Sequence, residues 1–210
     1  MRPSRINEVR EMYEATAHSY SRMMDAEIQL PVYSEVLKRL HSGIEGLPGS
    51  VIDTACGSGH MLSMYHHLFD PQRTLIGIDL SPRMVSIAAE RLGSSASMFV
   101  GDMRALHEIQ SCSAAALLNW YAIHHLSAAG LREAMKEWHR VLAPGGQLWV
   151  AAWEGAGLID YGEASDILAV RYSPGELTNM AEEAGFKITR CVVVPVEGFP
   201  MDGVHLECVK

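Results

Sequence analysis

From residue 50 onward, short apolar segments alternate with amphipathic ones, and this alternation restricts the possible folds more than any other feature. Apolar segments with the length of strands occur at residues 51–53, 74–79, 98–100, 114–120 and 147–153. Helical patterns separate them, and two of these begin with a helix-capping residue, Ser81 and Ser127. Strands that alternate with helices form a mainly parallel, doubly wound sheet with helices on both faces. We therefore predict an α/β fold over residues 50–210.

The end of the chain departs from this alternation. Two further strands are predicted at residues 186–196 and 204–209, and only residues 197–203 separate them. A crossover between parallel strands needs roughly a dozen residues or more. The last strand is therefore expected to run antiparallel to its neighbours.

The first 45 residues precede the sheet and carry helical patterns. Apolar residues recur at helical spacing from Ile6 to Met24, and Pro31 suits the first turn of a second helix. We predict a helical lid over residues 1–45, within one domain that spans all 210 residues. The first 25 residues are expected to be mobile without a ligand and to become ordered over one.

Charge limits the partners that such a domain is expected to have. The formal net charge is −8, and residues 151–210 carry 4 basic and 10 acidic side chains. A protein that binds DNA or RNA needs a basic face to neutralise phosphates, and the sequence offers none. Nucleic acid is therefore not an expected partner.

A membrane and a metal are not expected either. No apolar run approaches the ~20 residues that span a bilayer, and the N-terminus lacks the pattern of a signal peptide. The four cysteines are isolated, which is typical of free thiols in the cytoplasm. The histidine doublets at 66–67 and 124–125 are poor chelates, because adjacent side chains point apart.

Small and acidic residues gather at the ends of the first three predicted strands. Residues 53–59 form a glycine-rich turn that allows a ligand to approach the backbone and the next helix N-terminus. Asp79 ends the second strand, 20 residues after Gly59, where a carboxylate can accept hydrogen bonds from ribose hydroxyls. Asp102 follows the third strand and suits an adenine amino group. Together these residues predict a nucleoside-binding site.

A nicotinamide-dependent oxidoreductase is one class of protein with such a site. Its dinucleotide motif is Gly-x-Gly-x-x-Gly, but Leu62 stands where the third glycine belongs. No tyrosine is followed by a lysine four residues later, so the pair used by short-chain reductases is missing as well. The oxidoreductase is disfavoured and stays open as an alternative.

Five motifs in order resemble those of the class I S-adenosylmethionine-dependent methyltransferases, of the bacterial small-molecule type. They lie at residues 51–59, 77–84, 101–103, 117–126 and 140–146. The resemblance implies a Rossmann-like seven-stranded sheet with strand order 3-2-1-4-5-7-6 and strand 7 antiparallel. It implies S-adenosylmethionine as cofactor and S-adenosylhomocysteine as product. Ala55 departs from the family pattern, which often has glycine there.

The resemblance also assigns cofactor contacts position by position. The methionyl part is assigned to Asp53, Ala55, Gly57 and Gly59, and the ribose to Asp79. The adenine is assigned to Leu80, Asp102 and Met103, and Met84 belongs to the same motif as Leu80. The sulfonium end is assigned to the Asn119 backbone. Tyr20 lies on a segment that resembles the N-terminal lid of many relatives and is expected to close over the cofactor.

Methyl transfer from a sulfonium is an in-line displacement that depends mainly on alignment of the acceptor. His124 and His125 follow the fourth strand, where the acceptor enters in this family, and an imidazole with a pKa near ~6.5 suits a general base. Residues 153–172, with several carboxylates, and the N-terminal helices are predicted to roof the acceptor pocket. This acidic roof fits an amine acceptor or simply a solvated surface.

The expected acceptor is a small molecule, and its reacting atom stays open. A protein that binds S-adenosylmethionine without catalysis is a further alternative, and the sequence leaves the oligomeric state unknown.

Overall fold

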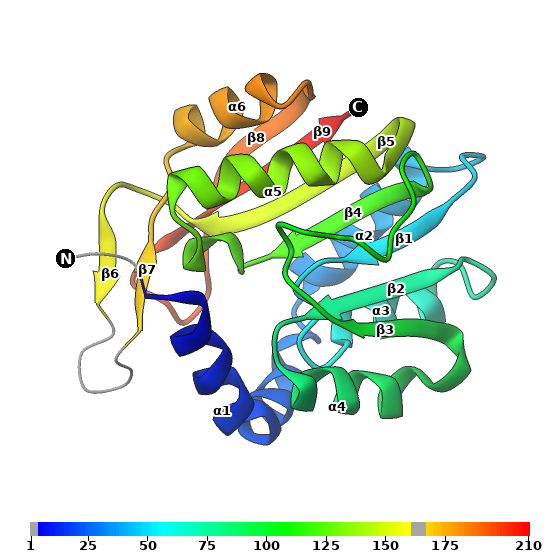
Figure 1. The fold of residues 1–210 in the computed structure, drawn as a ribbon, viewed down its shortest axis with the longest axis horizontal. Coiled ribbons are helices and arrows are strands. Elements are labelled where there is room, and N and C mark those ends of the chain that lie inside the picture. The colour runs from blue at the N-terminus through cyan, green and yellow to red at the C-terminus, as the bar shows by residue number, and fades with distance from the viewer. Residues whose placement is uncertain (1–3, 161–166) are drawn as a thin grey trace.

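The computed structural model describes residues 4–160 and 167–210. Its main sheet has seven strands in the order β3-β2-β1-β4-β5-β9-β8 (Figure 1). The strands are β1 Ser50–Asp53, β2 Leu75–Asp79, β3 Ala96–Val100, β4 Ala114–Trp120, β5 Leu142–Trp153, β8 Lys187–Pro195 and β9 Asp202–Val209. The first five run parallel, and β9 pairs antiparallel with both β5 and β8. The predicted strand order is confirmed, with β8 and β9 as the sixth and seventh strands.

Helices cover both faces of this sheet. They are α1 Ile6–Glu27, α2 Pro31–Gly43, α3 His60–Leu68, α4 Pro82–Leu92, α5 Ala128–Val141 and α6 Pro174–Glu183. Neighbouring residues of one strand face opposite sides, so Leu117 packs with α5 and α6 while Leu118 packs with α2 and α3. Each face of the sheet therefore has its own hydrophobic core, as a doubly wound sheet requires. In the described residues, no helix combines the length and apolarity needed to cross a membrane.

The two N-terminal helices have different places in the fold. The α2 side chains Val36, Leu37 and Leu40 are almost fully buried in the core beneath the sheet. By contrast, α1 lies across the carboxyl ends of the strands beside α4, and its buried residues are few (Figure 1). Of the lid predicted over residues 1–45, α1 covers the edge of the sheet where a ligand is expected, whereas most of α2 belongs to the core.

Two segments differ from the sequence expectation. β5 begins at Leu142, directly after α5, rather than at residue 147. Ala114 of β4 pairs with Leu142 and Ala116 pairs with Gln147, so the Pro-Gly-Gly turn lies within β5 at a register shift. Within the predicted roof, β6 Leu158–Asp160 and β7 Leu168–Val170 pair as a separate two-stranded sheet. Three-residue strands carry too little periodicity to be predicted. The roof residues Glu163 and Asp166 lie outside the described residues.

Candidate functional site

Two carboxylates organise the carboxyl ends of β1 and β2. Asp79 accepts hydrogen bonds from the backbone N–H groups of Gly57 and Ser81, each at 2.9 Å, so it ties the glycine loop to β2. Asp53 accepts from the N–H of Ala55 at 3.2 Å. Burial raises the pKa of both carboxyls, that of Asp53 to about 7. Neither forms an ion pair with a described lysine or arginine, so both suit a ligand that brings hydroxyl or ammonium donors.

The two glycines of the loop have separate structural tasks. Both have positive φ, +51° at Gly57 and +81° at Gly59, which strains any other residue. A Cβ at Gly57 would lie 3.3 Å from the Tyr20 ring, whereas a Cβ at Gly59 would lie 3.0 Å from the Cβ of Ala88 on α4. Gly57 therefore lies beneath α1, and Gly59 allows α3 to pack closely on α4.

A small cavity of about 60 Å³ lies over this loop. Predicted cofactor residues that line it are Tyr20, Ala55, Gly57, Asp79, Leu80, Met84 and Met103, joined by the predicted catalytic residue His125. Pockets that enclose molecules of this size class measure roughly 300–1,000 Å³. The α1 residues Ile6, Val9, Tyr13 and Tyr20 line this cavity, so we expect a nucleoside cofactor to displace α1.

Four predicted cofactor residues lie outside the lining of this cavity. They are Asp53, Gly59, Asp102 and Asn119. The Asp102 carboxylate is held by the Arg104 guanidinium, with a closest N–O distance of 2.6 Å. Burial alone would raise the pKa of Asp102, but the hydrogen bonds from Arg104 lower it overall. The Asn119 amide donates to the Thr54 hydroxyl at 3.0 Å and so joins β4 to β1.

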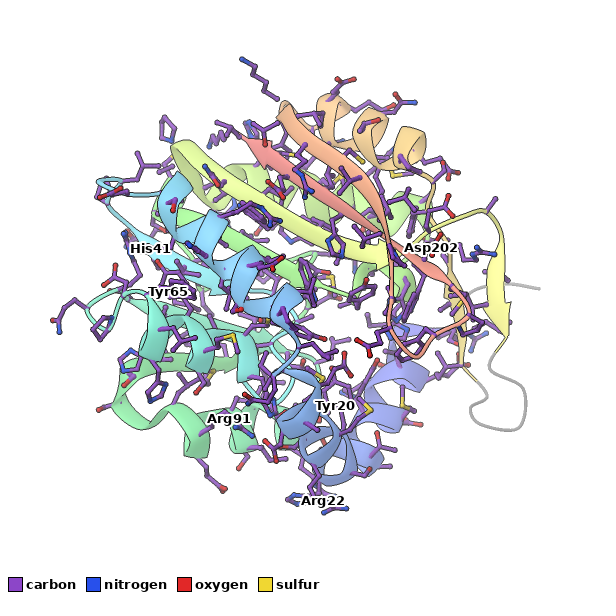
Figure 2. The ribbon with its side chains drawn as sticks, turned by 180° about the vertical axis from the view of Figure 1, so that it is seen from behind. Tyr20, Arg22, His41, Tyr65, Arg91 and Asp202 are labelled. Carbon is purple, nitrogen blue, oxygen red and sulfur yellow. The ribbon has the colours of Figure 1, made fainter. Side chains whose placement is uncertain are left out.

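A second cavity of about 720 Å³, here called the aromatic chamber, opens beside the first. It lies between α1, the start of α2, the ends of β4 and β5, and the turn from β8 to β9. Figure 2 labels Tyr20 on α1 and Asp202 at the start of β9. Its aromatic and ionisable lining comprises Tyr13, Tyr20, Tyr33, Trp120, Tyr121, Trp153, Phe199, His124, His125, His205, Glu27 and Glu197. A space of this size and composition suits one drug-sized organic molecule.

The two cavities share a wall, which consists of Tyr13, Tyr20, Trp120, Tyr121 and His125. The Tyr13 hydroxyl is hydrogen-bonded to Nε2 of His125 at 3.0 Å, and the Tyr13 and Tyr20 rings meet edge to face at 5.8 Å. A group that passes from one cavity to the other must cross this wall.

The wall and the chamber hold three neutral histidines. Burial lowers the pKa of His125 and that of His205 to about 4 each, and burial holds the pKa of His124 well below its ordinary value. An imidazole with such a pKa accepts a proton less readily than the ~6.5 assumed from the sequence implies. The structure therefore places both predicted catalytic histidines at the chamber but weakens each of them as a base.

Polar contacts that the sequence analysis missed hold α1 in place. The Glu14 carboxylate accepts hydrogen bonds from the Ser81 hydroxyl at 2.5 Å and from the Arg83 N–H at 3.0 Å. Farther along the helix, Asp25 is hydrogen-bonded to His60 at 2.8 Å and accepts from Arg91 at 3.0 Å. Figure 2 labels Arg91 on α4, where it faces α1. Glu14, Ser21 and Asp25 form one polar face of α1, and Arg91 also contacts Ser21. Their helical spacing is the sequence signal that could have predicted this face.

Other residues of the chamber were also missed, namely Glu27, Tyr33, Tyr121 and His205. Tyr121 has a φ of +50°, an uncommon conformation for a side chain of its size, directly after β4. Its hydroxyl lies 3.4 Å from Nε2 of His205 on β9. Residues from three distant parts of the chain meet here, so local sequence patterns do not reveal the cluster.

The comparisons with known proteins agree with this geometry. A family model described as a methyltransferase domain matches residues 51–146. The chain is 32% identical, over 70% of its length and 19% of the relative's, to the mouse (Mus musculus) tRNA (carboxymethyluridine(34)-5-O)-methyltransferase. It is 27% identical, over 88% of its length and 67% of the relative's, to the malonyl-(acyl-carrier protein) O-methyltransferase of Dechloromonas aromatica. It spans less than half the length of each tRNA methyltransferase relative that it matches.

The fold is also similar to that of a solved enzyme. The 1,6-didemethyltoxoflavin-N1-methyltransferase of Burkholderia thailandensis, solved with S-adenosylhomocysteine, has a TM-score of 0.76 and 18% identity. The match covers 97% of this chain and 88% of that one.

These findings correct one expectation from the sequence. Nucleic acid was excluded because no basic face was visible, yet three relatives are named as tRNA methyltransferases or probable ones. The exclusion was wrong in its reasoning as well, because charge counted along a sequence does not show how a folded surface is charged. The expectation of S-adenosylmethionine as the cofactor is confirmed, whereas the oxidoreductase alternative is not supported.

Proposed function

We propose that this chain, which belongs to the class I S-adenosylmethionine-dependent methyltransferase family, transfers a methyl group from S-adenosylmethionine to an acceptor bound in the aromatic chamber. The observation that carries the proposal is the wall shared by the two cavities. In-line transfer needs donor and acceptor on opposite sides of one narrow contact. A cofactor above the glycine loop and an acceptor in the chamber meet that condition at Tyr20, Tyr121 and His125.

The cofactor fits the residues around the glycine loop. Asp79 is the proposed partner of the ribose hydroxyls, and Asp53 of the positively charged methionyl amino group. Both are buried carboxylates without an ion-pair partner among the described residues, so donors from a ligand relieve the cost of their burial. Leu80, Met84 and Met103 offer apolar contacts for the adenine. When bound, the cofactor supplies an electrophilic methyl group.

The protein's own part in the reaction is alignment and exclusion of water. Little covalent help from the protein is needed, because the thioether is a good leaving group. The rings of Tyr20, Trp120 and Tyr121 are proposed to hold the acceptor against the cofactor, and α1 closes the site from solvent.

The acceptor is proposed to be a small molecule, because the chamber has the volume of a pocket for one drug-sized compound. A second candidate is a nucleoside within tRNA, which the names of three relatives favour. Both candidates present a compact, planar or apolar group to the same chamber. An experiment therefore has to offer both small molecules and tRNA as acceptors.

Transfer of a labelled methyl group tests the proposal. The protein is incubated with methyl-labelled S-adenosylmethionine and either a metabolite extract or unfractionated tRNA. We expect S-adenosylhomocysteine to form together with label in one of the two fractions. A Gly57→Val variant serves as the control, because its side chain would meet Tyr20 and strain the loop. Binding of S-adenosylmethionine without any turnover in either fraction would instead favour a non-catalytic binding protein.

A further inference from the structure

One carboxylate in the aromatic chamber, that of Glu27, shares the chamber lining with the phenols Tyr20, Tyr33 and Tyr121. Glu27, the last residue of α1, accepts a hydrogen bond from the Tyr33 hydroxyl. Burial, and the charge of Glu27 in addition, raise the pKa of Tyr20, Tyr33 and Tyr121. All three therefore lie within electrostatic reach of the same carboxylate.

Glu27 is also close to the place where the methyl group must cross. Two of its three phenols, Tyr20 and Tyr121, belong to the wall between the cavities. Tyr20 experiences the charges of Asp53 and Asp79 from the cofactor side and that of Glu27 from the chamber side. Glu27 thus shares the lining of the chamber with Tyr20, the side chain that covers the cofactor loop.

The chamber carries negative charge and aromatic surface but little that attracts an anion. Glu197 is a second carboxylate of its lining, and no lysine or arginine occurs among the described residues that line it. The nearest cations to His205 are Arg39 and Arg190, and both are paired with the Glu207 carboxylate, at 2.9 and 3.0 Å. An acceptor with a carboxylate or phosphate would meet repulsion here, whereas a cation would meet Glu27 and several ring faces.

We infer that the chamber accepts a protonated amine, which Glu27 binds and deprotonates before methyl transfer, a substrate class that rests on the function proposed above. The rings of Tyr33, Trp120 and Tyr121 supply cation–π contacts to the ammonium group, and Glu27 supplies the counter-charge. The Tyr33 hydroxyl orients the Glu27 carboxylate through their hydrogen bond.

The chemistry balances without another reactant. An ammonium nitrogen has no free electron pair, so it must lose a proton before it can attack. The proton passes to the Glu27 carboxylate, and the freed pair forms the bond from nitrogen to the methyl carbon while the bond from that carbon to sulfur breaks. The positive charge ends on the methylated nitrogen, which is again an ammonium ion.

Three indole probes of matched size test the inference by binding alone. Tryptamine carries an ammonium group, indole-3-acetate a carboxylate and tryptophol a hydroxyl group. Each is titrated calorimetrically at pH 7 into protein saturated with S-adenosylhomocysteine. Tryptamine is expected to bind at least about tenfold more tightly than indole-3-acetate, with tryptophol between them. The Glu27→Gln variant is expected to lose most of the preference for tryptamine and to bind tryptophol as the natural chain does.

The control variant is Glu45→Gln, which removes a carboxylate from an exposed position between α2 and β1 and should keep the full preference. Equal or tighter binding of indole-3-acetate, an unchanged preference in Glu27→Gln, or no measurable binding of tryptamine overturns the amine assignment. Titration of S-adenosylhomocysteine into each variant comes first. Its failure would contradict the proposed function, whereas normal cofactor binding without amine preference contradicts only the acceptor class.

Discussion

At the scale of single residues, the Asp79 carboxylate is the side chain on which both the loop and the cofactor depend. It already accepts two backbone hydrogen bonds, and a ribose would add two more. Hydrogen bonds to a charged group contribute roughly 1.5–3 kcal/mol each. Asp79→Ala is therefore expected to weaken S-adenosylmethionine binding at least about tenfold in a calorimetric titration. Asp79→Asn should lose less, because its amide oxygen still accepts one bond, and equal affinity in all three proteins would refute the assignment.

The buried histidine of β9 provides a second residue-scale prediction, on stability against pH. The folded-state pKa of His205, about 4, lies below the unfolded value of ~6.5, so unfolding takes up a proton between these pH values. The free energy of unfolding should fall as pH decreases from 6.5 to 4, by up to about 1.4 kcal/mol per pH unit from this group. The contribution of Asp53 to the pH dependence of the free energy of unfolding has the opposite sign, because folding raises the pKa of this carboxyl. Urea unfolding of His205→Gln should show a shallower fall than the natural chain, and parallel curves would exclude His205 as the cause.

At the residue scale, local motifs in the sequence singled out residues that the structure brings together. Gly57 and Asp79 were singled out because each lies in a short motif of its own, a glycine turn and an acidic strand end, and the structure joins them at 2.9 Å. The pairing of Asp102 with Arg104 was missed, although the two are neighbours in sequence, because a motif does not say which partner a carboxylate chooses. Glu27 was missed for a different reason. No motif near Glu27 in the sequence indicates the aromatic chamber that surrounds it in the fold.

At the scale of elements, α1 is held by polar contacts near its middle and near its end. Arg91 alone contacts Ser21 and Asp25 on α1 and the Ser58 carbonyl in the glycine loop. Such partly exposed contacts each stabilise by at most about 1 kcal/mol. Arg91→Ala should therefore leave the domain folded but open α1 more often, so that its amides exchange several times faster.

Hydrogen exchange with and without cofactor measures this directly. Amides of residues 8–24 should gain protection when S-adenosylmethionine binds, because the bound cofactor would add contacts to the α1 side chains that line the cavity over the glycine loop. Arg132→Ala is a matched control, since it removes a similarly exposed ion pair, with Glu183, far from α1. If residues 8–24 are equally protected with and without cofactor, α1 is a fixed part of the core rather than a lid.

At the scale of the whole molecule, topology was predictable and the acceptor chamber was not. Alternating strand and helix patterns predicted a mainly parallel, doubly wound sheet, and one connection too short for a crossover predicted the antiparallel last strand. The order of the seven strands was implied by the resemblance to the methyltransferase family, and the structure has that order. The chamber draws its lining from α1, α2, the residues after β4 and the β8–β9 turn. Which of these distant segments meet depends on helix lengths and packing angles, and no short motif encodes those. The two strands β6 and β7 escaped prediction for the simpler reason that they are only three residues long.

Truncation of the N-terminus separates the two parts of the molecule. Among the described residues, the core beneath α5 and α6 contains none from α1, and the core on the other face contains Met24 from that helix, with Tyr20 packed against it. A chain that begins at Ile28 is therefore expected to unfold cooperatively, with a somewhat lower melting temperature, and to lose turnover together with Tyr13, Tyr20 and Glu27. A chain that begins at Glu45 also lacks Val36, Leu37 and Leu40, whose burial contributes about 1.5–3 kcal/mol each. That chain should fail to fold. Circular dichroism melting and turnover of both chains check the prediction, and loss of folding already in the chain that begins at Ile28 would make α1 part of the core.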